Sequence, residues 1–320
     1  MSGALPDQFA PVAVVSRSGV DESIHFGAAV CIGTGGHVVH TVGDPSVWIY
    51  PRSATKPLQA LAMVRAGLDL PPEKLALVCS SHNGETVHQQ TAREILAGCG
   101  LDESALRNTA DHPMHAPSAR EAIRAGIAKS ALQMGCSGKH SGMVATCVAN
   151  GWPVDTYLEP DHPLQRAITD TVREVCGEPL AIGTDGCGAP AHVVRLESLA
   201  RAARAIATGA AGEPGDRIFA AMSGHPHMVG GTDRDVTRIV SAIPGFFAKD
   251  GAEAVFVGAS RDGRAVAVKV SDGGPRAHRT VFLAALAHLG FDVAGCAGDL
   301  AERTLGHGSP VGSVRALGFG

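Results

Sequence analysis

The sequence Arg52-Ser53-Ala54-Thr55-Lys56-Pro57-Leu58-Gln59 marks the point where the chain changes from a strand pattern to a helical one. Before it, β-branched apolar runs at 11–16, 24–32 and 37–42 predict an antiparallel meander. After it, apolar residues recur at helical spacing and predict a helix from Ser53 to about Gly67. The first part of the chain is therefore expected to form strands that lie beside this helix.

Outward from this point, helical patterns dominate to about residue 220, and strand patterns then return. The predicted helices are 86–97, 118–129, 141–149, 164–175, 197–207 and 276–289, and the later strands are 252–259 and 264–270. The segment 209–215 is predicted to be a surface loop. Strands at both ends and helices in the middle predict an α+β fold. The chain 1–320 is expected to be a single unit, with an antiparallel sheet from about 10–50 and 250–320 and a helical region at about 53–245.

Composition excludes several classes of partner. The net charge is −4, the pI is near 6.4, and the chain has only two Trp, two Tyr and nine Phe, which argues against nucleic-acid binding. No charged n-region precedes an apolar core, and no apolar stretch reaches the roughly 18 residues of a spanning helix. We therefore expect a cytoplasmic protein without a membrane partner.

A first candidate for chemistry is Ser53 with Lys56. Their i, i+3 spacing places the hydroxyl and the amine on one face of a helix, where a neutral lysine can accept the serine proton. The alternative for a lone Ser-x-x-Lys is a serine N-cap followed by a solvated first-turn lysine.

Two further segments carry polar groups beside apolar runs. In Cys79-Ser80-Ser81-His82-Asn83-Gly84, a hydroxyl can shuttle a proton and the Asn83 amide can hold a substrate or a lysine; the alternative is a turn and helix cap. In Lys249-Asp250-Gly251, placed just before the predicted strand 252–259, the lysine can enter a pocket and the glycine can let a ligand approach the backbone. A surface turn is the alternative there. The order Ser-x-x-Lys, Ser-x-Asn, Lys-x-Gly is that of serine β-lactamases and penicillin-binding proteins, which the chain resembles in this respect.

A fourth constellation combines Cys136-Ser137-Gly138-Lys139-His140 with Asp185-Gly186-Cys187-Gly188. Both segments are rich in glycine, so their backbone can fold tightly around a ligand. Two cysteines with Lys139, Asp185 or His140 supply enough ligands for zinc. The alternative is two buried cysteines near a loop.

Together these segments resemble the asparaginase II family, the rhizobial-type L-asparaginases. The strings that carry the resemblance, from about Val15 to Gly273, are 22–25, 43–45, 52–59, 81–85, 136–140, 185–188, 225–226, 230–232 and 249–253. The family implies a β-lactamase/glutaminase-like fold, a homodimer, L-asparagine as substrate, and two Ser-Lys pairs, Ser53 with Lys56 and Ser81 with Lys249. It also implies an accessory Zn²⁺ held by Cys136, Lys139 and Cys187, with Asp185 beside it. Two segments depart from the family pattern: Gly230-Gly231-Thr232-Asp233, and Asp250 where glycine is common.

The predicted reaction is attack of Ser53 on the side-chain amide, with Lys56 as base and with Ser81 and Lys249 passing a proton to the departing ammonia. Because asparagine is zwitterionic, Arg52 is expected to bind its carboxylate and Asp185 its ammonium. Asn83, His140 and Gly186 complete the predicted substrate site. Two alternatives remain: a zinc-dependent amidase in which metal-bound water attacks, and a non-catalytic amino-acid-binding protein on the same scaffold.

Overall fold

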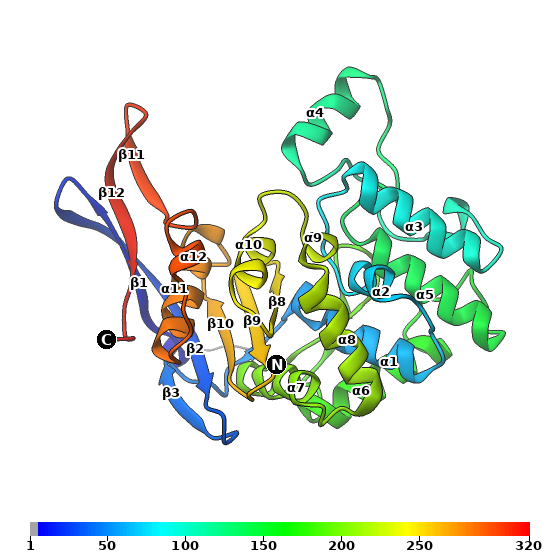
Figure 1. The fold of residues 1–320 in the computed structure, drawn as a ribbon, viewed down its shortest axis with the longest axis horizontal. Helices are drawn as coiled ribbons and strands as arrows, with labels where there is room; N and C mark the ends of the chain where they lie inside the picture. The colour runs from blue at the N-terminus through cyan, green and yellow to red at the C-terminus, as the bar shows by residue number, and fades with distance from the viewer. Residues whose placement is uncertain (1–5) are drawn as a thin grey trace.

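In the computed structural model, which describes residues 6–320, a sheet lies beside a block of helices (Figure 1). The eight-stranded sheet has the order β11-β12-β1-β2-β10-β9-β8, with β3 paired to β2 off this path. Every pairing in it is antiparallel. Its strands are β1 (Ala10–Arg17), β2 (Val20–Ile32), β3 (Val38–Val42), β8 (Phe246–Gly251), β9 (Val255–Ser260), β10 (Ala265–Val270), β11 (Arg303–Gly306) and β12 (Ser309–Ala316). The predicted α+β fold, with one antiparallel sheet from both ends of the chain, is confirmed.

The middle of the chain is helical, as predicted. Its helices are α1 (Lys56–Arg65), α2 (Pro72–Val78), α3 (Thr86–Gly98), α4 (Ala116–Arg124), α5 (Ser137–Asn150), α6 (Pro163–Cys176), α7 (Leu196–Thr208), α8 (Gly212–Gly224), α9 (Pro226–Val229) and α10 (Asp235–Ala242). The later helices are α11 (Pro275–His288) and α12 (Ala294–Ala297), and the 3₁₀ turns are η1 (Pro6–Gln8), η2 (Arg52–Thr55) and η3 (Glu103–Ala105). Two short hairpins pair β4 (Trp48–Ile49) with β7 (Val194–Arg195) and β5 (Ile182–Thr184) with β6 (Pro190–His192).

Three local predictions need correction. The loop predicted at 209–215 ends early, because α8 begins at Gly212. Ser53 does not open an α-helix: it lies in η2, and α1 begins only at Lys56. Lys249 does not precede a strand but lies within one, because β8 pairs with β9 over its whole length. The β8 segment has only three apolar residues before Lys249, too few for a clear strand pattern.

At β9, helices cover both faces of the sheet, and all six residues of this strand are buried. On one face, Phe256 stacks on Phe282 of α11, with ring centroids 4.2 Å apart. On the other face, Phe247 and Val257 meet the α7 side chains, including Leu199. Lys249 lies opposite Val257 and two residues after Phe247, so it points to this second face, toward the helical block.

None of the helices within residues 6–320 has the length and apolarity needed to cross a membrane. That the chain works as a single unit stays a prediction.

Candidate active site

Ser53 and Ser81 open onto the same cavity, of about 630 Å³. The cavity lies where η2, the loop after α2 and the end of β8 meet. Its wall also includes the predicted residues Arg52, Cys136, Asp185, Gly186 and Cys187, together with Arg234 and Asp250. Two hollows of similar size, about 670 and 720 Å³, contain none of the predicted catalytic residues. The structure therefore collects most of the predicted site around one cavity.

The turn that carries Ser53 is held against β8 by a close backbone contact. A Cβ atom added at Gly251 would clash with the Pro51 carbonyl oxygen and approach Ala54 N to 3.2 Å. Arg52, just before Ser53, has a φ of 53°, an unusual conformation for a residue with a side chain. Gly251 thus lets the strained turn approach the strand, whereas the sequence had suggested that it makes room for a ligand.

Lys56 is buried below the cavity, with 1% of its surface exposed. Its Nζ donates to the Ser80 carbonyl oxygen (2.5 Å), Ser81 Oγ (3.1 Å) and Cys136 Sγ (3.1 Å). The Lys56 backbone N–H donates to the Ser53 carbonyl oxygen, but within the described chain no side-chain hydrogen bond joins the two residues. The amine predicted to pair with Ser53 therefore contacts the second serine.

Lys249 is completely buried, and its Nζ donates to the Asp250 carbonyl oxygen and to Asp250 Oδ1, both at 2.6 Å. Burial lowers the pKa of the Lys249 amine from 10.5 to about 8; Asp250 opposes the shift and the Lys56 charge adds to it. No hydrogen bond between Lys249 and Ser81 is present in residues 6–320. The two predicted Ser-Lys pairs are thus present as residues around one site, while the contact that forms is Lys56 with Ser81.

Arg234 is a site residue that the sequence analysis missed. Its Nη2 donates to Asp250 Oδ2 at 2.5 Å, and its Nη1 donates to the Ser81 carbonyl oxygen at 3.2 Å. Burial acts to raise the pKa of Asp250, but Lys249 and Arg234 outweigh it and hold that pKa far below its usual range. Asp250, one of the departures from the family pattern, therefore forms an ion pair with the residue that follows the other departure, at 230–233. The two departures from the family pattern were therefore the sequence signal that could have pointed to Arg234.

Arg52 and Asp185, the two residues predicted to bind the charged ends of a substrate, bind each other. Arg52 Nε and Nη2 both lie 2.7 Å from Asp185 Oδ1. Burial acts to raise the pKa of Asp185, but the Arg52 hydrogen bond and the Lys139 charge lower it overall. The carboxylate is therefore anionic, and a guanidinium and a carboxylate stand side by side at the cavity wall.

Two predicted substrate residues lie outside the cavity wall. Asn83 is buried and donates through Nδ2 to the Thr232 carbonyl oxygen at 2.7 Å. His140 is buried, with Nδ1 2.8 Å from the Tyr157 hydroxyl. Asn83 holds the loop after Ser81 against residues 230–232. His140 lies behind the cysteines.

The predicted zinc ligands lie together and suit that ion. Lys139 Nζ is 3.1 Å from Cys187 Sγ, and all three side chains are buried. A hydrogen bond from Cys187 lowers the pKa of Cys136 well below its usual value against the effect of burial, aided by the Lys56 and Lys139 charges. His140 Nε2 is buried without a hydrogen-bond partner among the described residues. Two thiols and nearby nitrogen donors form the sulfur and nitrogen set that zinc prefers.

Solved structures similar to the chain include a β-lactamase from Mycobacterium bovis, 17% identical, covering 82% of this chain and 94% of its own, with a TM-score of 0.40. A putative β-lactamase from Bacteroides dorei DSM 17855 is 14% identical, covering 78% of this chain and 86% of its own, with a TM-score of 0.41. Mglu, in its native form in the presence of 4.3 M NaCl, is 15% identical with a TM-score of 0.36; the match covers 80% of this chain but only 60% of Mglu.

A search of curated proteins finds no match. The family described as L-asparaginase II matches residues 13–316, which include all the cavity residues described above. The chain therefore belongs to the L-asparaginase II family.

Proposed function

We propose that the protein hydrolyses L-asparagine to L-aspartate and ammonia through an ester on a serine. The observation that supports this most directly is that Ser53 and Ser81 line one cavity, with the buried amine of Lys56 hydrogen-bonded to Ser81. A hydroxyl next to a positioned amine is the arrangement that serine amidohydrolases of the Ser-Lys type need. A homodimer and a cytoplasmic location are carried over from the sequence as predictions.

In the proposed reaction, Ser53 Oγ attacks the side-chain amide carbon, and Lys56 accepts the hydroxyl proton. Backbone N–H groups at the start of the helical turn stabilise the oxyanion. The carbon–nitrogen bond then breaks, the nitrogen receives a proton and leaves as ammonia, and a β-aspartyl ester remains on Ser53. Water hydrolyses this ester by the reverse proton route and releases L-aspartate.

Ser81 and Lys249 are proposed to move the proton that the leaving nitrogen needs. Ser81 Oγ is 3.1 Å from Lys56 Nζ, so the hydroxyl can pass a proton between that amine and the cavity. Lys249, with a pKa of about 8, can be neutral near physiological pH. The like charges of the two lysines oppose protonation of both at once.

Recognition is proposed to use the Arg52–Asp185 pair. The substrate carboxylate would accept hydrogen bonds from Arg52, and its ammonium would donate to Asp185. The carboxylate and the ammonium of the amino acid would then bind Arg52 and Asp185, which form an ion pair with each other in the structure.

Zn²⁺, when bound, would be held by Cys136, Lys139 and Cys187 and would supply a fixed positive charge at the cavity wall. Lys139 would have to lose its proton to bind the ion. Cys136 also lies beside Lys56, whose Nζ is 3.1 Å from Cys136 Sγ.

Ammonia release from asparagine, glutamine and a β-lactam, each with and without added zinc, tests the function. We expect asparagine to be hydrolysed and Ser53→Ala to abolish its turnover. If chelation abolished turnover while Ser53→Ala stayed active, the zinc-dependent amidase would be favoured. Binding of asparagine without ammonia release would favour a silent binding protein and overturn the proposal.

A further inference from the structure

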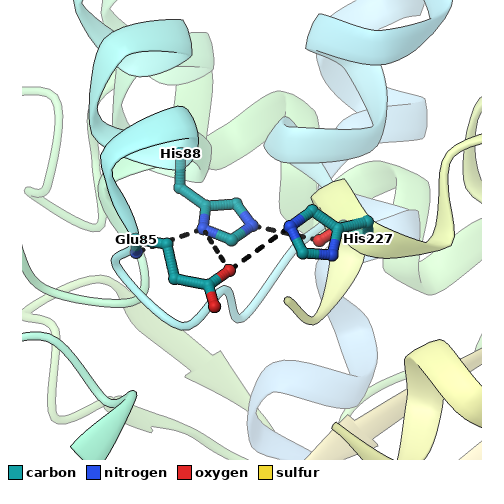
Figure 2. Close-up of side chains that lie close together, drawn as sticks. All are labelled: Glu85, His88 and His227. Carbon is teal, nitrogen blue, oxygen red and sulfur yellow. Dashed lines mark hydrogen bonds and ion pairs between the residues drawn. The ribbon is translucent and has the colours of Figure 1, made fainter. Parts of the chain in front are cut away.

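A cluster of one carboxylate and two imidazoles lies outside the cavity wall, next to the loop that carries Ser81. Figure 2 shows its members, Glu85, His88 and His227. Glu85 is the N-cap of α3, His88 lies in the first turn of that helix, and His227 lies in α9. The proposed hydrolysis uses none of the three. Glu85 and His88 form a capping box at the start of α3, which does not account for the approach of His227 to Glu85.

The spacing of the three side chains is that of metal ligands. Glu85 Oε2 lies 3.6 Å from His88 Nδ1 and 3.3 Å from His227 Nε2. A charge-assisted hydrogen bond would bring these atoms to about 2.8 Å. Ligands bound about 2.05 Å from a tetrahedral ion lie roughly 3.3 Å from one another. One ligand atom from each residue lies within 4.8 Å of the others.

The hydrogen bonds around His88 select the form that can bind a metal. His88 Nε2 is 3.0 Å from the His227 carbonyl oxygen, which can only accept, so this nitrogen carries the proton. The Nδ1 lone pair then lies toward Glu85, whose Oε2 is 3.6 Å away. A metal-binding histidine usually donates its other N–H to such a partner. The Glu85 backbone N–H donates to Nδ1 at 3.2 Å, and an ion would take over this lone pair.

The other two side chains are also prepared for binding. The Thr232 backbone N–H lies 3.3 Å from both carboxylate oxygens of Glu85, which orients that carboxylate. The His227 side chain is 49% exposed, whereas His88 is completely buried, so solvent reaches the cluster from one side. His115 Nδ1, 3.8 Å from Glu85 Oε1, lies at the edge of the cluster.

We infer that Glu85, His88 and His227 form a second metal site, for a divalent transition-metal ion such as zinc. Its donors are nitrogen and oxygen only, which distinguishes it from the cysteine site. Water or His115 completes the coordination.

This site joins two segments of the active site. Ser81 N donates to the Val229 carbonyl oxygen at 3.2 Å, and Asn83 N donates to the Gly230 carbonyl oxygen at 2.8 Å. An ion bound by Glu85, His88 and His227 adds a clamp between the same segments. It therefore fixes the Ser81 loop against the chain that leads to Arg234.

Cobalt titration of the purified full chain tests the inference, because Co²⁺ absorbs differently at the two sites. Thiolate ligands give an intense charge-transfer band in the near ultraviolet, whereas nitrogen and oxygen ligands give only weak visible bands. We expect His227→Ala to bind one equivalent fewer than the wild type, or to bind it at least about 100-fold more weakly, and to keep any thiolate band unchanged. Glu85→Gln, which preserves side-chain shape, should behave in the same way.

His37→Ala is the matched control, because His37 is exposed and far along the chain from the cluster. It should bind cobalt as the wild type does, and circular dichroism should show that all variants are folded. Equal stoichiometry and affinity in His227→Ala, Glu85→Gln and His37→Ala would overturn the inference. So would a wild type whose only cobalt signal is the thiolate band. Neither result bears on ammonia release, so the proposed hydrolysis is tested separately.

Discussion

Lys56 Nζ lies 3.1 Å from Ser81 Oγ, although Ser81 is 25 residues away and Ser53 only three. Both serines line the cavity, so either hydroxyl could form the ester that the proposed reaction requires. The i, i+3 spacing favours Ser53, and the observed contact favours a proton-transfer role for Ser81.

The first prediction assigns the ester. Rapid quenching of the enzyme with asparagine, followed by mass spectrometry of proteolytic fragments, should place the β-aspartyl adduct on Ser53. Ser53→Ala should lower kcat by at least about 1,000-fold, as loss of a nucleophile does. Ser81→Ala should still form the adduct but turn it over slowly. An adduct found on Ser81 would reverse the two roles.

The second prediction concerns pH. Lys249 must be neutral to take up the proton that it then relays to the leaving nitrogen, so kcat/KM should rise as the pH passes through about 8, the pKa of Lys249. Lys249→Met should be much less active, and its residual kcat/KM should lack this rising limb of the pH profile. Lys129→Met, which changes an exposed lysine, should keep the wild-type profile. If the rise of kcat/KM near pH 8 persisted in Lys249→Met, it would have to come from another titrating group.

The third prediction uses the anion beside Lys249. Asp250 raises the pKa of this lysine, so Asp250→Asn should lower it and move the limb of the pH profile to lower pH. The same change removes the carboxylate that accepts from Arg234. Asp299→Asn, on an exposed aspartate, is the control and should leave the limb in place. A shift to higher pH would contradict the electrostatic argument.

The fourth prediction concerns recognition. Arg52→Gln and Asp185→Asn should each raise KM by about 10- to 100-fold with a smaller change in kcat, because each removes a charged hydrogen bond to the substrate. Steady-state kinetics with asparagine measures both constants. A fall in kcat alone would mean that the pair only shapes the Ser53 turn.

The fifth prediction tests the close contact between η2 and β8. Gly251→Ala should push the Ser53 turn away from the strand, lower kcat by about 10-fold or more and destabilise the protein by about 1–3 kcal/mol. Gly98→Ala has open space around the new Cβ and a helical backbone, so it should leave kcat unchanged and preserve stability. Urea unfolding and ammonia release give the two readouts.

The sequence predicted the sheet from both chain ends because its apolar runs and helical spacings are local properties. It also predicted the chemically active part of the cavity wall, since Ser53, Ser81, Cys136, Asp185 and Cys187 stand in recognisable strings. Contacts between distant segments do not follow from such strings. Lys56 contacts Ser81 because the loop after α2 passes beside the Lys56 amine. The spacing of residues within one helix does not specify where that loop runs.

Arg234 and the cluster around Glu85 were missed for the same reason. Each residue is unremarkable in its own segment, and its meaning depends on a partner in another one. Arg234 gains its role from Asp250, and Glu85 gains its role from His227. Histidines next to proline indicate loops, and only the fold shows which loops meet.

The register of the sheet pairs Ala13 in β1 with Ala316 in β12. During synthesis, β1 leaves the ribosome long before β12, so one edge of β1 has no partner strand until β12 has also emerged. An open strand edge is a template for aggregation, and such distant pairings slow folding. Until β12 pairs with it, this edge of β1 is therefore a site at which partly synthesised chains can associate. Overexpression at high temperature should reveal this as inclusion bodies before it affects the finished enzyme.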